Sequence, residues 1–583
     1  MPHFRMPLSK LIAVCAWSAA LATGTQALSD PAGAYLAARV AAQSSDYETA
    51  SKYFDQLMAG GMQDAATLET ALINHVILQD FDRTTALVDQ LVAAAGDDGS
   101  QIAALVQLAT VAKQGDFAAG LTLVEDGANA GPLVLGLYKA WALVGEGRMA
   151  EALEAFDAMA KQPALAGFAS YHKALALAQV GDFEGAEEIL AGPAADVIHR
   201  SRRGVLAHVQ VLSQLERNDE ALQVMAAVFG DTLDPHLLQV REQLTDGEAL
   251  PFTVARNATD GIAELYFTVA TALAGEVPDA FPLVHTRLAH WLRPDHEDAI
   301  LLSASLLEEQ KQFDLAIATY QEILPESPLF QAAEMGRAEA MVRADRTDAA
   351  IEVLQSLARA EEDSPGVWTS LGDVLRREER YDEATKAYDS AIEAIPDPQA
   401  ADWFVFYARA ISEERADHWD AAEADFRRAL DLNPGQPSVL NYLGYSYVEK
   451  KQNLDEALGM IEQAVAARPD SGYIVDSLGW AYFELGRYQE SVEQMERAVE
   501  LEAVDPLVND HLGDVYWAVG RKREAEFQWK RALSFAAAVD NKTDMDIERV
   551  RRKLEVGLDV VREEEGAPPL SAVKREVMDE AAQ

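Results

Sequence analysis

Histidine side chains are the residues of this sequence best suited to hold a metal ion, and three of the eleven lie near one another. They are His285, His290 and His296, with Pro294 between the last two. Because a helix turns by about 100° per residue, the first two would lie roughly 500° apart around a shared helix and would not occupy one face. We therefore expect no metal site, and no cofactor.

Motifs of known catalytic chemistry are also missing. The sequence contains no P-loop spacing, no H-E-x-x-H and no G-x-S-x-G. The stretch G-E-G-R-M-A at Gly145 imitates a dinucleotide-binding loop, but it follows an expected helix instead of a strand, so we interpret it as a turn. The sequence predicts no catalytic residue and no enzyme. A hydrolase or transferase hidden in residues 231–295 is the alternative, and it would need a compact non-helical fold there.

The chain is strongly acidic. Its 583 residues include 96 Asp and Glu against 49 Lys and Arg, a formal net charge of −47. Such a negative field repels nucleic acid and anionic lipid and attracts basic partners. We expect no nucleic-acid binding. The charges are spread along the chain, so an acidic solvated surface suited to a salty habitat is an alternative explanation.

Residues 1–27 are typical of a secretory signal peptide. Basic residues precede the apolar run Leu11–Ala22, which is too short to span a bilayer, and small residues follow. Cleavage after Ala27 would remove Cys15, the single cysteine, so the mature chain would have no disulfide and no thiol nucleophile. We expect an exported protein without a transmembrane helix in its mature form. A first solenoid helix, or a lipoprotein modified at Cys15, is the alternative.

A repeated pattern between residues 365 and 533 must organise the fold. Gly372, Gly444, Gly479 and Gly513 mark one position at steps of 72 (two units of 36), 35 and 34 residues. A small residue of the following helix recurs in register, at Ala384, Ala422, Ala457, Ser491 and Ala525. Self-similarity at this period indicates a solenoid.

The residue types at these positions fit close packing of helices. Trp368, Leu371, Gly372 and Leu375 fall at i, i+3, i+4 and i+7, which is one face of a helix. Glycine or alanine at the contact lets two antiparallel helices approach closely. Neither helix can bury its apolar stripe alone, so we expect each pair to stack on the next.

The pattern W-x2-L-G followed by A-x3-Y-x2-A-x4-P resembles the tetratricopeptide repeat. The resemblance implies an all-α fold, a right-handed superhelix of antiparallel helix pairs with about 12–14 repeats, some degenerate. The stretch N-Y-L-G-Y-S-Y at Asn441, with D-S-L-G-W-A-Y and H-L-G-D-V-Y-W after it, also resembles exported cell-envelope tetratricopeptide proteins of Gram-negative bacteria.

The organisation that we predict has six parts. They are a signal peptide (1–27), a degenerate solenoid (28–230), an irregular helical joint (231–295), a C-terminal solenoid (296–540, strongest over 365–533), a capping helix (541–562) and a disordered tail (563–583). Glycines and prolines weaken the pattern in the joint. A degenerate repeat with a lengthened loop is the alternative there.

The resemblance also implies a ligand groove, because first helices of such pairs line the concave surface. The positions carried over are Thr369, Asp373, Asn441, Tyr445, Asp476, Trp480, Asp510, Asp514 and Trp517. Asn and Asp would bond a peptide backbone or a basic side chain, and the aromatics would supply apolar or cation-π contacts. Packing within the repeats and a solvated acidic surface is the alternative interpretation.

These features together predict a non-catalytic scaffold of the periplasm or of the periplasmic face of the outer membrane. It would bind a protein or peptide with a basic or aromatic segment, in envelope assembly or quality control. An architectural or self-associating solenoid without a dedicated ligand is the second hypothesis. The sequence leaves the oligomeric state open.

Overall fold

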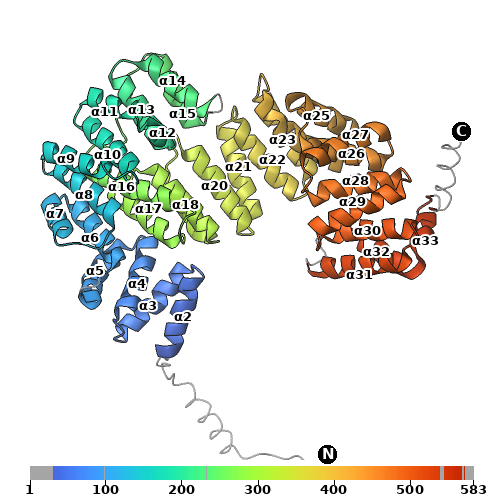
Figure 1. Cartoon of the computed structure of the whole chain (residues 1–583), viewed down its shortest axis with the longest axis horizontal. Helices are drawn as coiled ribbons and strands as arrows, with labels where there is room; N and C mark the ends of the chain where they lie inside the picture. Colours follow the sequence, from blue (N-terminus) through green and yellow to red (C-terminus); the bar gives the residue numbers. More distant parts are fainter. Residues whose placement is uncertain (1–30, 97–98, 231–232, 539–543, 568–569, 571–583) are drawn as a thin grey trace, which may run out of the picture. The chain divides into compact units, whose positions relative to one another are not determined.

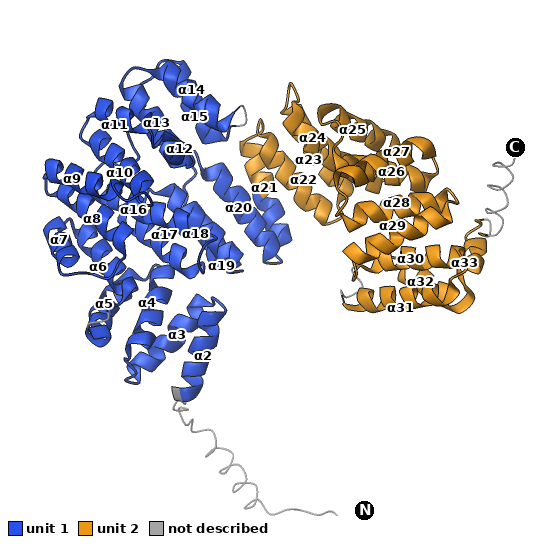
Figure 2. Ribbon diagram, viewed as in Figure 1, with its two compact units in different colours: residues 1–353 blue, residues 354–583 orange. Residues whose placement is uncertain are grey.

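The computed structural model describes residues 31–96, 99–230, 233–538, 544–567 and 570, and every regular element in these ranges is helical. The expected signal peptide lies outside the described residues, and so do residues 568, 569 and 571–583 of the expected tail. The chain divides into two compact units, residues 1–353 and 354–583 (Figure 2). Among the described residues, no helix is both long and apolar enough to cross a membrane.

The first unit consists of helices joined by short turns (Figure 1). Their bounds are α2 (Pro31–Gln43), α3 (Tyr47–Ala59), α4 (Ala65–Ile77), α5 (Phe81–Ala95), α6 (Gln101–Gln114), α7 (Phe117–Glu125), α8 (Pro132–Gly145), α9 (Met149–Ala160), α10 (Ala166–Gln179), α11 (Phe183–Leu190), α12 (Ala195–Ile198), α13 (Arg202–Gln214), α14 (Asn218–Phe229), α15 (Pro235–Thr245), α16 (Ala258–Leu273), α17 (Ala280–Leu292), α18 (Glu297–Glu309), α19 (Phe313–Tyr320) and α20 (Phe330–Arg343).

The second unit continues the same arrangement after α21 (Thr347–Ala360), which spans the boundary. Its helices are α22 (Pro365–Arg377), α23 (Tyr381–Glu393), the short η2 (Ala400–Asp402), α24 (Trp403–Arg415), α25 (Trp419–Leu432), α26 (Pro437–Lys450), α27 (Leu454–Ala467), α28 (Gly472–Glu484), α29 (Tyr488–Leu501), α30 (Pro506–Ala518), α31 (Lys522–Ala538), α32 (Ile547–Val556) and α33 (Leu558–Glu564). Within each unit, consecutive helices pair and each pair packs on the next. This confirms the predicted solenoid of helix pairs.

The turn within many of the pairs follows one local rule. In the third pair, Gly115 takes a left-handed φ of 74° and ends α6, and the side chain of Asp116 then caps α7 by accepting a hydrogen bond from the backbone N–H of Ala119. The aromatic residue Phe117 opens the second helix. The same order, a left-handed residue, a capping aspartate and an aromatic, recurs at residues 45–47, 79–81 and 181–183.

The four marker glycines occupy equivalent contacts between the helices of a pair. A Cβ atom added at Gly372, Gly479 or Gly513 would come within 3.0 Å of the side chain sixteen residues later, which is Tyr388, Met495 or Trp529. At Gly444 it would meet Ile461 and the backbone carbonyl of Ala457. The repeat marker is therefore a position where the backbones of two antiparallel helices approach too closely for a side chain.

Replacing Gly444 by leucine should lower the free energy of unfolding of the second unit by about 1–3 kcal/mol, because overpacking forces neighbouring side chains and backbone apart. Gly459 on α27 provides the matched control, since space is open around its Cβ position. Gly459→Ala should raise the free energy of unfolding by about 0.5–1 kcal/mol, because alanine favours a helix. Urea unfolding followed by circular dichroism measures both, and equal effects of the two changes would contradict the close contact.

The region that we predicted as an irregular joint contains three helices, α15, α16 and α17, within its described residues 233–295. Helices α16 and α17 form an antiparallel pair that packs against α4, α6, α8 and α10, all of them first helices of pairs in the first unit (Figure 1). Helix α17 then packs on α18, so the solenoid resumes from this pair. The alternative of an additional repeat after a lengthened loop describes these residues better than a hinge does.

Buried polar contacts fix this hairpin. The hydroxyl of Tyr266 donates a hydrogen bond of 2.7 Å to the carbonyl of Leu105, and the guanidinium of Arg287 donates one of 3.1 Å to the carbonyl of Ile77. Gly261 lies against the ring of Trp141, closer than any Cβ atom would allow. One glycine that we interpreted as an interruption is therefore another close helix contact.

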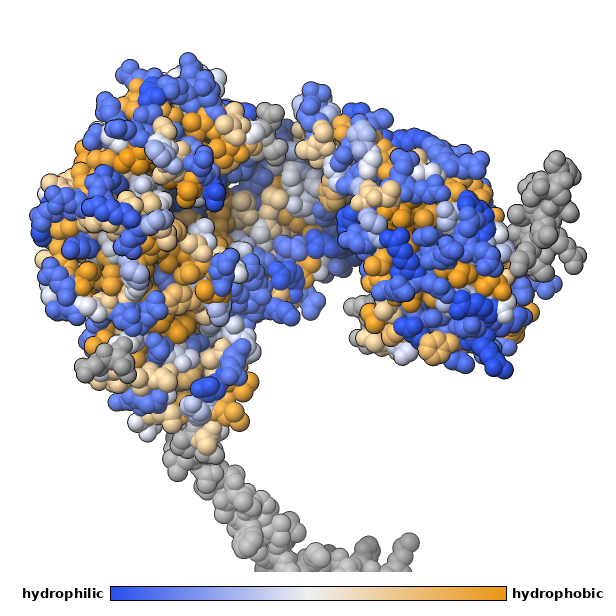
Figure 3. All heavy atoms as spheres, viewed as in Figure 1, coloured by the Kyte–Doolittle hydropathy of each residue, from blue (hydrophilic) through white to orange (hydrophobic). Residues whose placement is uncertain are grey.

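The surface carries polar and apolar residues side by side. In Figure 3, hydrophilic residues are interspersed with hydrophobic ones over the visible faces of both units, without a single polar block. This agrees with the even spread of Asp and Glu along the sequence.

Candidate functional site

The surface formed by the first helices of the second unit, α22, α24, α26, α28 and α30, carries all nine residues of the predicted groove; we call it the first-helix surface. The structure places these residues in two groups. Five of them lie in or beside one connected cluster on α28 and α30, and four lie on α22 and α26 outside it.

The cluster begins with a buried aspartate and a histidine. Asp476 on α28 is 5% exposed, and its carboxylate oxygen lies 2.9 Å from Nδ1 of His511 on α30. The ring of Trp480 stacks on the imidazole of His511 at 4.2 Å between centroids, and on Phe483 at 4.8 Å. Asp476 and Trp480 thus bind α28 to α30 within the protein.

A buried lysine completes the cluster. Nζ of Lys553 on α32 donates hydrogen bonds of 2.7 Å to both Asp510 and Asp514. Asp514 also accepts a 2.9 Å bond from the indole N–H of Trp529. The side chain of Lys553 has no exposed surface, so the ion pairs are shielded from solvent. The basic side chain that we expected from a partner is supplied here by the chain itself.

Helix α33 turns back over the first-helix surface. Gly557, at a left-handed φ of 86°, lies against the ring of Trp517, where a Cβ atom would come within 2.5 Å. The indole N–H of Trp517 donates a hydrogen bond of 3.1 Å to Asp559. The guanidinium of Arg562 lies over the ring of Phe483 on α28. Two short helices, at 547–556 and 558–564, thus stand where we predicted one capping helix at 541–562.

Titration of the cluster follows from burial and charge. Burial lowers the pKa of His511, but the nearby carboxylates of Asp476, Asp510 and Asp514 outweigh it, and the pKa of His511 lies above its ordinary value. Burial raises the pKa of Asp510, and the ammonium of Lys553 offsets only part of this rise.

The other four predicted residues lie outside this cluster. On α22, the hydroxyl of Thr369 donates to the carbonyl of Pro365, and Asp373 accepts a 2.7 Å bond from Tyr388 of the same pair. On α26, Asn441 is half-buried, and its Oδ1 atom is buried without a hydrogen-bond partner among the described residues. Tyr445 is half-buried too, and burial followed by the charges of Glu449 and Asp476 raises its pKa.

Sequence reasoning missed several members of this surface. In the repeat of α24, Ala410 replaces the marker glycine, so Tyr407 and Ile411 at the equivalent positions were not selected. The spacing of the repeat could have identified these two positions, because Ala410 precedes Ala422 by the same twelve residues that separate Gly372 from Ala384. The rings of Tyr407 and Tyr442 meet edge to face at 6.1 Å.

The three histidines considered for a metal site contact different groups. Nδ1 of His285 lies 2.9 Å from the carbonyl of Phe281, His290 faces Glu322, and His296 lies 3.3 Å from Glu264. In the described part of the chain, no group of three or more His, Cys, Asp or Glu has the arrangement of a metal site.

The fold and its repeated close contacts define a helical-repeat solenoid. Sequence profiles of the tetratricopeptide repeat match residues 307–374, 365–398, 407–472, 449–507 and 477–538. Residues 307–398 and 407–538 are therefore identified as tetratricopeptide repeats. Proteins of this family generally bind other proteins, and the fold is generally non-catalytic.

Two relatives match parts of the chain. A TPR repeat-containing protein of Pseudomonas aeruginosa is 26% identical over 190 residues, which cover 32% of this chain and 31% of the relative. A chloroplastic tetratricopeptide repeat domain-containing protein of Arabidopsis thaliana, PYG7, is 31% identical over 124 residues, covering 21% of this chain and 41% of the relative. The chain thus matches less than half the length of each.

Solved helical-repeat structures resemble the chain at low identity. The Cut9–Hcn1 hetero-tetramer of the APC/C aligns with a TM-score of 0.38 and 14% identity, covering 91% of this chain and 97% of that one. Yeast Tom70 aligns with a TM-score of 0.33 and 14% identity, covering 90% and 95%.

Lys553→Met should destabilise the second unit by about 3–5 kcal/mol, because it removes the ammonium that two buried carboxylates share and leaves Asp514 with only the guanidinium of Arg549, 3.4 Å away. Adding Asp510→Asn and Asp514→Asn removes those charges, so the triple variant should be more stable than Lys553→Met alone. Urea unfolding of the full chain measures both. A triple variant whose loss equals the sum of the separate losses would show that the three groups are not coupled.

The second unit should lose stability as the pH rises from about 6.5, the ordinary pKa of histidine. His511 has a raised pKa when folded, so its protonated form stabilises the fold below the unfolded pKa, and this contribution disappears as the pH rises through the folded pKa. His511→Asn should flatten the difference in unfolding midpoint between pH 6 and pH 8.5. A variant with the same pH dependence as the natural chain would exclude this role.

Proposed function

We propose that the protein is a non-catalytic scaffold that binds a protein or peptide segment along the first-helix surface of its second unit. The family supports protein binding in general. The proposal that the partner segment is basic rests on Lys553, whose ammonium lies between the carboxylates of Asp510 and Asp514. A surface that accepts a lysine from a basic helix of its own chain has the charge needed for a basic segment of a partner.

The proposed binding region is the part of this surface on α22, α24 and α26. Here Asn441 keeps a buried side-chain oxygen without a hydrogen-bond partner among the described residues, and Tyr407 and Tyr445 stay half-buried. These groups offer an acceptor for a backbone or basic donor, and faces for an apolar or cationic side chain. Asp510, Asp514 and Trp517 become accessible to a partner only when α32 and α33 leave.

We further propose that the protein is exported and acts in the periplasm or at the periplasmic face of the outer membrane, in envelope assembly or quality control. The support is the signal-like sequence of residues 1–27 and the likeness of one region to the Pseudomonas protein. An architectural or self-associating solenoid is the second candidate, since helical repeats stack on like surfaces.

Photo-crosslinking at Tyr445 tests the proposed surface. Benzoylphenylalanine in place of Tyr445 keeps an aromatic side chain there, and in intact cells of the source organism it should give discrete adducts with a protein partner. Asn441→Lys in the same chain should reduce these adducts at least tenfold, because it puts a cation where a basic segment binds. Gln489→Lys, at an exposed position of the second helix α29, is the matched control and should leave the yield unchanged.

Adducts that survive Asn441→Lys would exclude this surface as the binding site. Adducts formed only with another copy of the chain, together with concentration-dependent sedimentation, would favour the architectural role. Fractionation of the same cells locates the protein, and recovery of the uncleaved chain in the cytoplasm would contradict export.

A further inference from the structure

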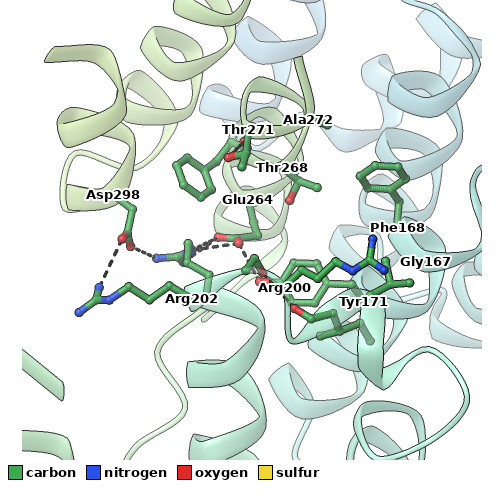
Figure 4. Close-up of a pocket in the computed structure, with 15 residues that line it drawn as sticks. Gly167, Phe168, Tyr171, Arg200, Arg202, Glu264, Thr268, Thr271, Ala272 and Asp298 are labelled. Atoms are coloured by element: carbon green, nitrogen blue, oxygen red, sulfur yellow. Dashed lines mark hydrogen bonds and ion pairs between the residues drawn. The ribbon is translucent and has the colours of Figure 1, made fainter. Parts of the chain in front are cut away.

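A cavity of about 560 Å³ opens in the first unit, between α10, α12, α13 and α16. Its wall is mainly apolar, with Phe168, Ile198, Phe267 and Ala272 among the lining residues (Figure 4). This volume falls within the range of roughly 300–1,000 Å³ that small-molecule sites occupy. The lining residues all belong to the first unit and the first-helix surface belongs to the second, so this inference does not depend on the function proposed above.

Charges in the floor of the cavity neutralise one another. Glu264 is buried, and its carboxylate accepts hydrogen bonds from Arg203 at 2.8 Å and from the hydroxyl of Tyr171. Burial raises the pKa of Glu264, but Arg203 and His296 together outweigh it, so the pKa lies well below its ordinary value and the carboxylate stays ionised. Asp298 is paired with the guanidinium groups of Arg203 and Arg202. Each acid in the floor thus has an arginine as its counter-charge.

One cation remains at the mouth. Arg200 is exposed, and it is the charged lining residue whose side chain makes no hydrogen bond or ion pair with any described residue. Figure 4 shows its side chain extending toward Phe168, over the apolar wall. On α16, Thr268 also lines the cavity and is half-buried. A free guanidinium beside an apolar chamber is notable in a chain with a net charge of −47.

We propose that this cavity binds a single-chain anionic amphiphile, with its acid group on Arg200 and its hydrocarbon tail against Phe168 and Phe267. Arginine binds carboxylates through paired N–H donors, and the contact is stronger beside an apolar wall than in open water. The tail gains free energy by leaving water, in proportion to the apolar area it covers. A cationic amphiphile would bring like charges together, and a neutral one would leave the guanidinium without a counter-ion.

Isothermal titration of the full chain with dodecanoate, below its micelle concentration and at pH 8, tests the proposal. Saturable binding of one dodecanoate per chain is expected, at least tenfold tighter than binding of dodecyltrimethylammonium or monododecanoylglycerol. Arg200→Glu should weaken dodecanoate binding tenfold or more, because it removes a charge-assisted hydrogen bond and adds repulsion. Thr268→Phe should weaken it as well, by filling the chamber.

Lys52→Glu is the matched control: it makes the same change in net charge at an exposed position of α3 and should leave binding unchanged. Circular dichroism checks the fold of each variant, and Arg200→Gln replaces Arg200→Glu if the latter misfolds. Absence of saturable dodecanoate binding, equal binding of the cationic analogue, or unchanged affinity without the arginine would each overturn the proposal.

Discussion

A unit of two helices, about 34 residues in all, cannot bury its own apolar face, and the whole structure depends on this constraint. Each pair must lie against another surface of matching shape. The close contacts at Gly372, Gly444, Gly479 and Gly513 join the two helices of each pair, because a missing side chain lets the large residue of the facing helix enter. Each joined pair then packs on the next one. A stack built in this way always leaves a last pair, and the last pair needs a cover.

The chain provides covers of two kinds. In the first unit, the pair α16–α17 lies on the first helices of earlier pairs and starts the next part of the stack. In the second unit, α32 packs on α31 and α33 turns back over α30. Both covering segments contact first helices of helix pairs. The protein itself therefore occupies part of the surface that such repeats offer to ligands. This limits the open ligand surface to the helices that neither cover reaches.

Local patterns of the sequence predicted the local structure well. The helix pairs and the glycine contacts both depend on residues within one unit of about 34 residues. Contacts between distant segments escaped prediction, since periodicity carries no information about them. In the sequence, Gly261 resembles a helix break, but in the structure it makes room for the ring of Trp141. Lys553 resembles a solvated charge, but its ammonium binds Asp510. Likewise, nothing local shows that Arg203 and Glu264 meet in the floor of a cavity.

The two covers differ in chemistry, and the difference indicates where a ligand can act. In the first unit, Tyr266 and Arg287 donate to backbone carbonyls of Leu105 and Ile77, which another side chain cannot easily reproduce. In the second unit, the contacts join side chains, a lysine to two aspartates and an indole to Asp559. A partner with a basic and an acidic side chain in corresponding places could make the same contacts in place of the protein's own lysine and aspartate. The first cover therefore belongs to the core of its unit, whereas the second occupies a surface whose chemistry is open to competition.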